Sequence, residues 1–173
     1  MTNIAISDIT LRRYSETDGA ALSFNEKVET VKRLDKLNAD VIETAPVLSG
    51  KTDVLFLHTA ASLIKNSTLS CPTALTEESV EETYNAIKGA KKPRVLIPVP
   101  VSTVQMEYVC GKKPAKMLAL VEALVKKAAS LCGDVEVSQL DATRAERDFI
   151  GSVIDTAVKH GAKTVSLCDN AGT

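Results

Sequence analysis

The chain has 173 residues, of which 45% are hydrophobic and 25% are charged, and its formal net charge is −1. This is the composition of an ordinary globular domain that is long enough to bury a sizeable core. The near-zero charge argues against a strongly basic surface, so we expect neither nucleic acid nor an anionic membrane as a partner.

The cysteines and the apolar runs indicate the cellular compartment. Cys71, Cys110, Cys132 and Cys168 are widely spaced and form no CxxC pair. The longest uncharged apolar run, residues 95–104, is too short to span a bilayer, and no secretory signal precedes the first strand-like segment. We therefore predict reduced thiols and a cytoplasmic protein.

The first half of the chain alternates strand-like apolar runs with helical patterns. Residues 4–7 predict a strand, and a polar loop over residues 13–22 is expected to follow it. Ser23 and Glu26 have the spacing of a capping box and predict the start of a helix. Further strands are predicted at residues 40–45 and 69–74, with a helix between them that Thr52 or Asp53 caps.

The second half continues the same alternation. Thr76 precedes two acidic residues that suit the first turn of a helix, and residues 94–99 predict a strongly apolar strand. Pro114 fits the first turn of a long helix. The last two strands are predicted at residues 135–140 and 164–168, with a helix between them that ends at His160-Gly161.

Strict alternation of strands and helices indicates an α/β fold with a parallel sheet and right-handed crossovers. No Gly-x-Gly-x-x-Gly and no Walker lysine motif follows any of the predicted strands, which disfavours a Rossmann or P-loop nucleotide site. Two architectures stay open on this pattern alone, an open doubly wound sheet and part of a (β/α)8 barrel.

Polar residues gather where several of the predicted strands end. Asp8 and Arg12 follow the first strand, Asp141 and Arg144 follow the fifth, and Asp169 follows the sixth. Parallel α/β proteins build their active sites at the carboxyl ends of their strands, so we expect a functional site there.

These same segments carry a resemblance to a known family. Ser7-Asp8-Ile9-Thr10-Leu11-Arg12 resembles the opening motif of the pyruvate carboxyltransferase-like barrels, also called the HMGL-like or DRE-TIM metallolyase family. The resemblance continues at Val41-Ile42-Glu43 and at Ser102, and it is best over residues 141–149 and 169–172. The family includes 2-isopropylmalate, homocitrate and citramalate synthases and HMG-CoA lyase.

The resemblance implies a fold. Residues 1–173 would be the N-terminal part of a TIM-barrel domain, namely the first six βα units of an incomplete (β/α)8 barrel. A barrel closes by pairing its last strand with its first, so the first and sixth strands here become edges with exposed apolar faces. We expect a fragment of a longer enzyme or, as the alternative, copies that complete each other's sheet in a homo-oligomer.

The resemblance also implies an activity and a set of site residues. The activity is that of an acyltransferase in amino-acid biosynthesis, which condenses acetyl-CoA with a 2-oxo acid at a divalent metal, Mg²⁺, Mn²⁺ or Zn²⁺. Asp8 is implied as a metal ligand, Arg12 as the catalytic arginine that stabilises negative charge on the 2-oxo oxygen, and Glu43 as a second catalytic candidate. The candidates for substrate contact are Ser102, Asp141, Thr143 and Asp169.

The chain departs from the family pattern at several positions. Arg13 and Leu140 stand where the family usually has acids, and Gln105 stands where it usually has a histidine. The two histidines of the chain, His58 and His160, do not form the family's His-x-His metal motif. We therefore expect these 173 residues alone to be inactive and to bind metal poorly. Two alternatives stay open, a carbon–carbon lyase of the HMG-CoA lyase kind and an inactive homologue with a regulatory or assembly role.

Most of the site residues also have a purely structural interpretation. Asp8, at the end of a strand, can accept hydrogen bonds from loop amides, and Arg12 can form a buried ion pair with Glu43. Asp141 can cap the fifth helix. The lysines of the Lys112-Lys113 pair are expected to be solvated, although they lie on the side of the site and can meet a CoA phosphate.

Overall fold

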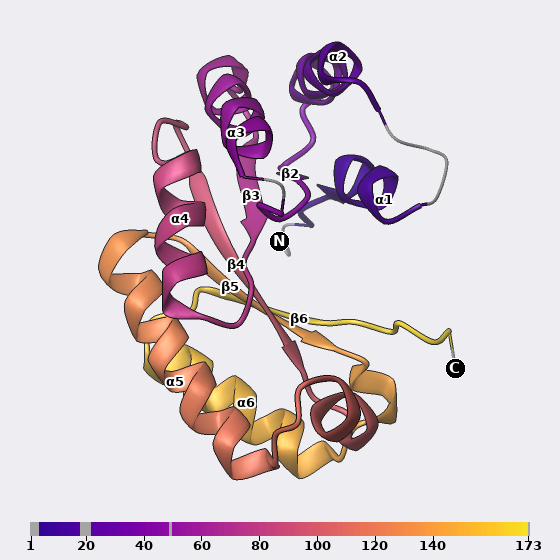
Figure 1. Cartoon of the computed structure of the whole chain (residues 1–173), viewed down its shortest axis with the longest axis vertical. Coiled ribbons are helices and arrows are strands. Elements are labelled where there is room, and N and C mark those ends of the chain that lie inside the picture. The colour runs from indigo at the N-terminus through magenta and orange to yellow at the C-terminus, as the bar shows by residue number, and fades with distance from the viewer. Residues whose placement is uncertain (1–3, 18–21, 49, 173) are drawn as a thin grey trace. The chain divides into compact units, whose positions relative to one another are not determined.

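The computed structural model describes residues 4–17, 22–48 and 50–172. Strands and helices alternate throughout these ranges (Figure 1). The strands are β1 (Ser7–Asp8), β2 (Val41–Glu43), β3 (Thr68–Pro72), β4 (Pro93–Pro100), β5 (Val135–Leu140) and β6 (Thr164–Leu167). The α-helices are α1 (Thr10–Glu16), α2 (Phe24–Lys36), α3 (Lys51–Leu63), α4 (Glu77–Ile87), α5 (Pro114–Leu131) and α6 (Arg147–Lys159). A π-helical segment, η1 (Gln105–Val109), follows β4, and a 3₁₀ turn, η2 (Ala142–Arg144), follows β5.

The strands form one parallel sheet in the order β1-β2-β3-β4-β5-β6. Ser7 lies opposite Val41 in the β1–β2 pair, and Ser138 lies opposite Ser166 in the β5–β6 pair. Sequential order with a helical connection between neighbouring strands is the arrangement of a (β/α)8 barrel and not of a doubly wound sheet. The α/β fold predicted from the sequence, the first six βα units of such a barrel, is confirmed.

The chain divides into two compact units, which are described separately below. Unit 1 comprises residues 1–72 and 82–95, and unit 2 comprises residues 73–81 and 96–173. In unit 1, α2 and α3 lie side by side over a core that includes Ile42, Leu57 and Leu69. In unit 2, α5 and α6 lie side by side (Figure 1), and the core residues include Ile97, Leu124, Val137 and Val153.

Local sequence signals explain several helix ends. The Ser23 hydroxyl accepts from the Glu26 amide and the Glu26 carboxylate accepts from the Ser23 amide, so the predicted capping box is present. Pro114 occupies the first turn of α5. Gly161 follows α6 with φ +113°, and a Cβ there would lie 2.9 Å from the Ala129 Cβ, so glycine allows both the turn and the approach to α5.

The segment after β1 differs from the prediction. A helix, α1, runs from Thr10 to Glu16, where residues 13–22 were expected to be a loop, and residues 18–21 lie outside the described ranges. The first strand is Ser7–Asp8 and not residues 4–7. The prediction that Thr52 or Asp53 caps α3 is also wrong, because the cap position is Gly50 and no side chain bonds there.

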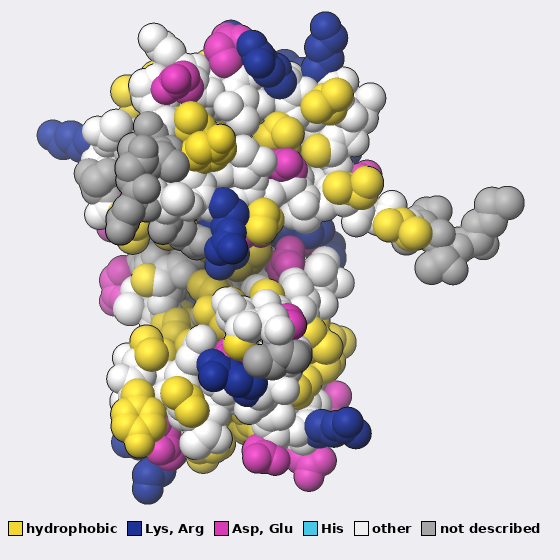
Figure 2. Space-filling model, turned by 90° about the vertical axis from the view of Figure 1, so that its right-hand side faces the viewer, with side chains coloured by type: hydrophobic (Ala, Val, Ile, Leu, Met, Phe, Trp, Pro, Cys, Tyr) yellow, Lys and Arg dark blue, Asp and Glu magenta, His cyan; other side chains and the backbone are white. Residues whose placement is uncertain are grey.

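Apolar side chains are exposed at both edges of the sheet. Ile6, next to β1, is 66% exposed, and Leu167 of β6 is 61% exposed. This agrees with the expectation that the first and sixth strands are sheet edges. On the face drawn in Figure 2, hydrophobic side chains reach the surface between charged ones. No helix among the described residues is long and apolar enough to cross a membrane.

Candidate functional site

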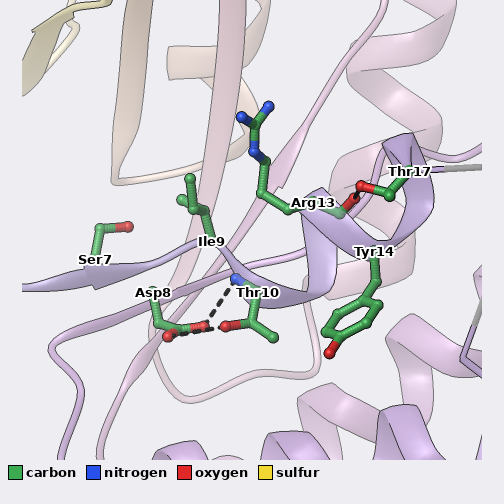
Figure 3. Close-up of a pocket in the computed structure, with 7 residues that line it drawn as sticks. All are labelled: Ser7, Asp8, Ile9, Thr10, Arg13, Tyr14 and Thr17. Atoms are coloured by element: carbon green, nitrogen blue, oxygen red, sulfur yellow. Dashed lines mark hydrogen bonds between the residues drawn. The ribbon is translucent and has the colours of Figure 1, made fainter. Parts of the chain in front are cut away.

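In unit 1, the carboxyl ends of β1 and β2 carry Asp8 and Glu43, because both residues end their strands. The Asp8 carboxylate accepts from the Thr10 amide at 3.0 Å and from the Thr10 hydroxyl at 3.2 Å (Figure 3). These bonds satisfy an amide in the first turn of α1, which has no side-chain bond at its own cap position. The structural role expected for Asp8 as an alternative, acceptance of a hydrogen bond from a nearby backbone amide, is therefore present. A carboxylate has about four lone-pair sites, so these two bonds leave capacity for a further ligand.

Arg12 and Glu43 form an ion pair. Arg12 Nη1 lies 2.5 Å from Glu43 Oε1, and the side chains are 23% and 8% exposed. The pair connects α1 to the end of β2, and Leu11, the residue before Arg12, is buried in the core. Charge-assisted hydrogen bonds of this kind are stronger than those between neutral groups. The ion pair predicted as the alternative role of Arg12 is thus present, and the guanidinium stays partly exposed.

Beside this pair, α1 and the end of β1 line an open depression of about 510 Å³. Asp8, Arg13 and Tyr14 are among its lining residues. In Figure 3, Asp8 turns toward Thr10, while the Arg13 side chain points away from Asp8. Arg13, the residue that replaces the usual acid of the family, therefore lines the same depression as the metal-ligand candidate Asp8.

The described residues provide one candidate metal ligand and not a complete set. Among them, no group of three or more His, Cys, Asp or Glu side chains is arranged to hold a metal ion. Divalent cations in proteins need several ligands at fixed geometry. The residues in the described ranges therefore do not form a complete metal site by themselves.

In unit 2, a buried cluster forms around Asp141, directly after β5. Its carboxylate accepts two bonds from the Arg144 guanidinium, at 2.8 and 2.7 Å, and one from the Ser102 hydroxyl at 2.5 Å. Its backbone amide donates to Asn170 Oδ1 at 2.7 Å. The carboxyl ends of β4, β5 and β6 are thus joined through one fully buried acid.

The environment of Asp141 keeps it ionised. The Arg144 guanidinium, and then the Ser102 hydroxyl, lower the pKa of Asp141 below its ordinary value, against the opposing effect of burial. Asp141 has φ +59°, a left-handed conformation that aspartate tolerates better than most residues. Asp141 starts the turn η2. The helix predicted as the fifth is α6 in the structure, and its cap residue is Glu146, so the alternative that Asp141 caps this helix is wrong.

Thr143 and Asp169 lie at the solvent-exposed side of the same strand ends. The Thr143 hydroxyl donates to Asp169 Oδ1 at 3.1 Å, and the Gly172 amide donates to the same oxygen at 2.8 Å. Of the predicted substrate-contact residues, these two are exposed, whereas Ser102 and Asp141 are buried in the polar cluster.

Two members of the cluster were not identified as site residues from the sequence. Arg144 is among the polar residues that follow the predicted strands, but the sequence gives it no role, and Asn170 lies only within the resemblance over residues 169–172. The available signal was the spacing of Asp141 and Arg144, which allows a side chain to reach back over one turn. The bond from the Asp141 amide to Asn170 spans 29 residues and has no local signal.

Comparisons with known proteins identify the family of the chain. The HMGL-like family model matches residues 3–173. A 2-isopropylmalate synthase of Caulobacter vibrioides is 33% identical over 170 residues, which are 98% of this chain and 32% of that protein. A 2-isopropylmalate synthase of Pyrococcus abyssi is 30% identical over 172 residues, 99% of this chain and 35% of that protein. The chain therefore spans about a third of the length of these curated relatives.

Among solved structures, the carboxyl transferase domain of Rhizobium etli pyruvate carboxylase aligns with 94% of this chain and 40% of that chain. The alignment has 11% sequence identity and a TM-score of 0.38.

Proposed function

Because the chain belongs to the HMGL-like family, we propose that it is the part of an acyltransferase that condenses acetyl-CoA with a 2-oxo acid. The name 2-isopropylmalate synthase, which the curated relatives share, supports a condensation in amino-acid biosynthesis. The observation that carries the proposal is the pairing of Arg12 with Glu43 at the ends of β1 and β2. In the reaction, the acetyl methyl group loses a proton, its carbon bonds to the carbonyl carbon of the 2-oxo acid, and the former carbonyl oxygen takes up a proton. Water then cleaves the thioester to give a carboxylate and the free CoA thiol.

Arg12 is proposed to stabilise the negative charge that grows on the 2-oxo oxygen as the carbon–carbon bond forms. A guanidinium presents five donors in a planar fork, so one edge can pair with Glu43 while another faces a substrate oxygen. Its partial burial strengthens this interaction, because water screens the charge less than at an open surface. A donor fixed in advance needs little reorganisation during the reaction.

Glu43 is proposed to act through Arg12. Its side chain is 8% exposed and its carboxylate accepts from the guanidinium, so it is better placed to orient Arg12 than to exchange a proton with substrate. We therefore assign Glu43 as a positioning residue, in place of the broader catalytic role expected from the sequence.

A divalent cation, Mg²⁺, Mn²⁺ or Zn²⁺, is retained as a proposed cofactor of the longer protein, with Asp8 as one ligand. When bound, such an ion would supply Lewis-acid polarisation of the ketone. The other ligands would come from outside the described residues, since these contain no ligand cluster.

For the substrate, we propose Thr143 and Asp169 as contacts, because both are exposed at strand ends. Ser102 and Asp141 are proposed to support the shape of the same region through their mutual bond. A homo-oligomer and a cytoplasmic location stay predictions from the sequence, as does the assignment of residues 1–173 to the N-terminal part of one barrel domain.

The experiment is a turnover assay on the longest natural polypeptide that contains this chain. Free CoA thiol is followed with acetyl-CoA and a panel of 2-oxo acids. The proposal expects CoA release that depends on one or a few of these acids. Release of acetyl-CoA from a product-like hydroxyacyl-CoA would instead favour the lyase, and no activity in either direction would favour the inactive homologue.

A further inference from the structure

We propose that the segment from Val104 to Lys116, after β4, binds the phosphorylated adenosine end of CoA. This inference rests on the proposed function, which supplies CoA as the ligand, and it adds a place and a set of residues. The segment comprises η1, the turn at Gly111 and the first residues of α5 (Figure 1, between β4 and α5).

The first observation is an exposed apolar surface on η1. Tyr108 is 84% exposed, Val109 is 76% exposed and Val104 is 54% exposed. Large apolar side chains that are exposed together commonly mark a binding surface. A π-helical segment inside an otherwise regular fold is also frequent at functional sites. An exposed tyrosine ring is suited to stack on a flat heteroaromatic base.

The second observation is the charge beside this surface. Residues 104–116 carry three lysines, Lys112, Lys113 and Lys116, and a single acid, Glu107. Within the described part of the chain, none of these lysines forms an ion pair, and Lys112 Nζ only contacts the Cys110 carbonyl at 3.5 Å. The excess of positive charge complements phosphate groups, which lysines bind as point charges.

The third observation is that this segment is tied to the candidate site. The Gln105 amide donates to the Ser102 hydroxyl, which in turn donates to Asp141. Met106 is 2% exposed, and its carbonyl accepts from the Lys112 amide at 2.9 Å. Gly111, with φ +59°, makes the turn that brings the chain back for this bond. The apolar and basic parts are therefore held together at the carboxyl end of β4.

The Tyr108 ring and the three lysines lie in one segment, close to the strand ends that carry Thr143 and Asp169. This combination suits a ligand that has a base and phosphates at one end. CoA has its adenine and phosphates at one end and its reactive thioester at the other. In this arrangement, the nucleotide end lies on η1 and the thioester end extends toward the strand ends.

The test is calorimetric titration of the chain with acetyl-CoA, with adenosine 3′,5′-bisphosphate and with inorganic phosphate. We expect acetyl-CoA and the bisphosphate to bind, and phosphate to bind far more weakly. Tyr108→Ala should weaken both nucleotide ligands about tenfold, because one base-stacking contact is lost. Tyr108→Phe keeps the ring and should bind as the wild type does. Since Tyr108 is exposed, neither change should unfold the chain.

Lys113→Ala should also weaken both ligands and should reduce the salt dependence of binding, since a phosphate contact is screened by salt. Lys91→Ala is the matched control, because Lys91 is an exposed lysine that precedes the amino end of β4. Unchanged affinities in Tyr108→Ala and Lys113→Ala would overturn the inference, as would the absence of bisphosphate binding. Self-association of the wild type that Tyr108→Ala abolishes, without any effect of ligand, would also overturn it.

These results separate the inference from the proposed function. Acetyl-CoA turnover that persists in Tyr108→Ala with unchanged KM overturns the nucleotide site and leaves the condensation in place. Bisphosphate binding that depends on Tyr108 and Lys113, without turnover of any 2-oxo acid, supports the nucleotide site and overturns the condensation.

Discussion

Arg12 Nη1 lies 2.5 Å from Glu43 Oε1, so an ion pair joins α1 to the carboxyl end of β2. Removing the charge of Glu43 leaves a partly buried guanidinium without its carboxylate. We expect Glu43→Gln to lower the free energy of unfolding by about 2 kcal/mol, as measured by urea denaturation. Glu29→Gln removes the partner of Lys32 in an exposed pair on α2, and we expect it to leave the stability almost unchanged, because water and salt screen such a pair. Equal losses in the two variants would show that the Arg12–Glu43 pair is not specially stabilising.

Asp35 at the end of α2 predicts a pH dependence of stability. Its carboxylate accepts from the amides of residues 65, 66 and 67 at 2.9 to 3.0 Å. Burial alone would raise the pKa of Asp35, but these amide bonds outweigh it and lower the pKa below the ordinary value of 3.8. A depressed pKa contributes stability that is complete above the ordinary value and is lost as the pH falls through the folded-state value.

The measurement compares wild type with Asp35→Ala by chemical denaturation at several pH values. At pH 7 the variant should be less stable by about 3 kcal/mol, and the difference should shrink below the ordinary pKa of 3.8. Asp155→Ala, at an exposed position on α6, is the control, and it should leave the stability at pH 7 almost unchanged. A difference for Asp35→Ala that stays constant down to pH 2 would contradict the assigned role of the charge.

The Asp141 cluster predicts the titration of one carboxyl group. The Asp141 pKa is lowered first by Arg144 and then by Ser102, so the carboxyl resonance should titrate below the ordinary value of 3.8 in NMR spectra. Arg144→Ala should raise the midpoint more than Ser102→Ala does, because the guanidinium has the larger effect. Arg147→Ala, at the start of α6, should not move it. A midpoint at the ordinary value in the wild type would show that the cluster does not form.

The cysteines should differ in reactivity. Cys71 is fully buried, and burial raises the pKa of its thiol to about 12, so almost no thiolate exists at neutral pH. Cys132 is also buried, whereas Cys110 and Cys168 are partly exposed. In native protein, iodoacetamide labelling followed by peptide mass spectrometry should modify Cys110 and Cys168 well before Cys71. Rapid labelling of Cys71 without denaturant would contradict the packing of β3.

The strands after β1 could be predicted from the sequence because each lies in a short, largely apolar run bounded by polar or turn residues, whereas β1 is only Ser7–Asp8, at the end of the run predicted at residues 4–7. For β5, the predicted and observed ranges agree over residues 135–140. The helix α1 was missed because its sequence has little apolar periodicity. It depends instead on Asp8, which bonds the Thr10 amide, and on Leu11, which is buried. Whether such a short helix forms depends on the tertiary contacts of a few single residues.

The strand-end positions of three candidate residues could be predicted from the sequence, but their bonding could not. In unit 1, Asp8 and Glu43 end β1 and β2, and in unit 2, Asp141 directly follows β5. The partners of Asp141 were not predictable, because its left-handed backbone and its bonds to residues 102 and 170 depend on segments distant in sequence. The spacing of residues in the sequence indicates which side chains are neighbours within one turn or helix. It does not indicate which of the loops that follow different strands are in contact.

The proposed condensation is tested most directly by the effect of Arg12 on kcat. The assay measures CoA release from acetyl-CoA with each 2-oxo acid, using the longest natural polypeptide that contains the chain. Wild type, Arg12→Ala and Arg12→Lys are compared, with Arg33→Ala at an exposed position on α2 as the control. Matched circular dichroism spectra establish that each variant is folded.

We predict that wild type and Arg33→Ala turn over at least one acid with similar kcat. Arg12→Ala should lower kcat on the order of a hundredfold to a thousandfold, with a smaller change in KM, because the charge that Arg12 stabilises develops only as the bond forms. Arg12→Lys should recover little, since an ammonium does not reproduce the planar fork. Near-full kcat in both Arg12 variants, or no turnover of any acid by the wild type, would contradict the proposed function.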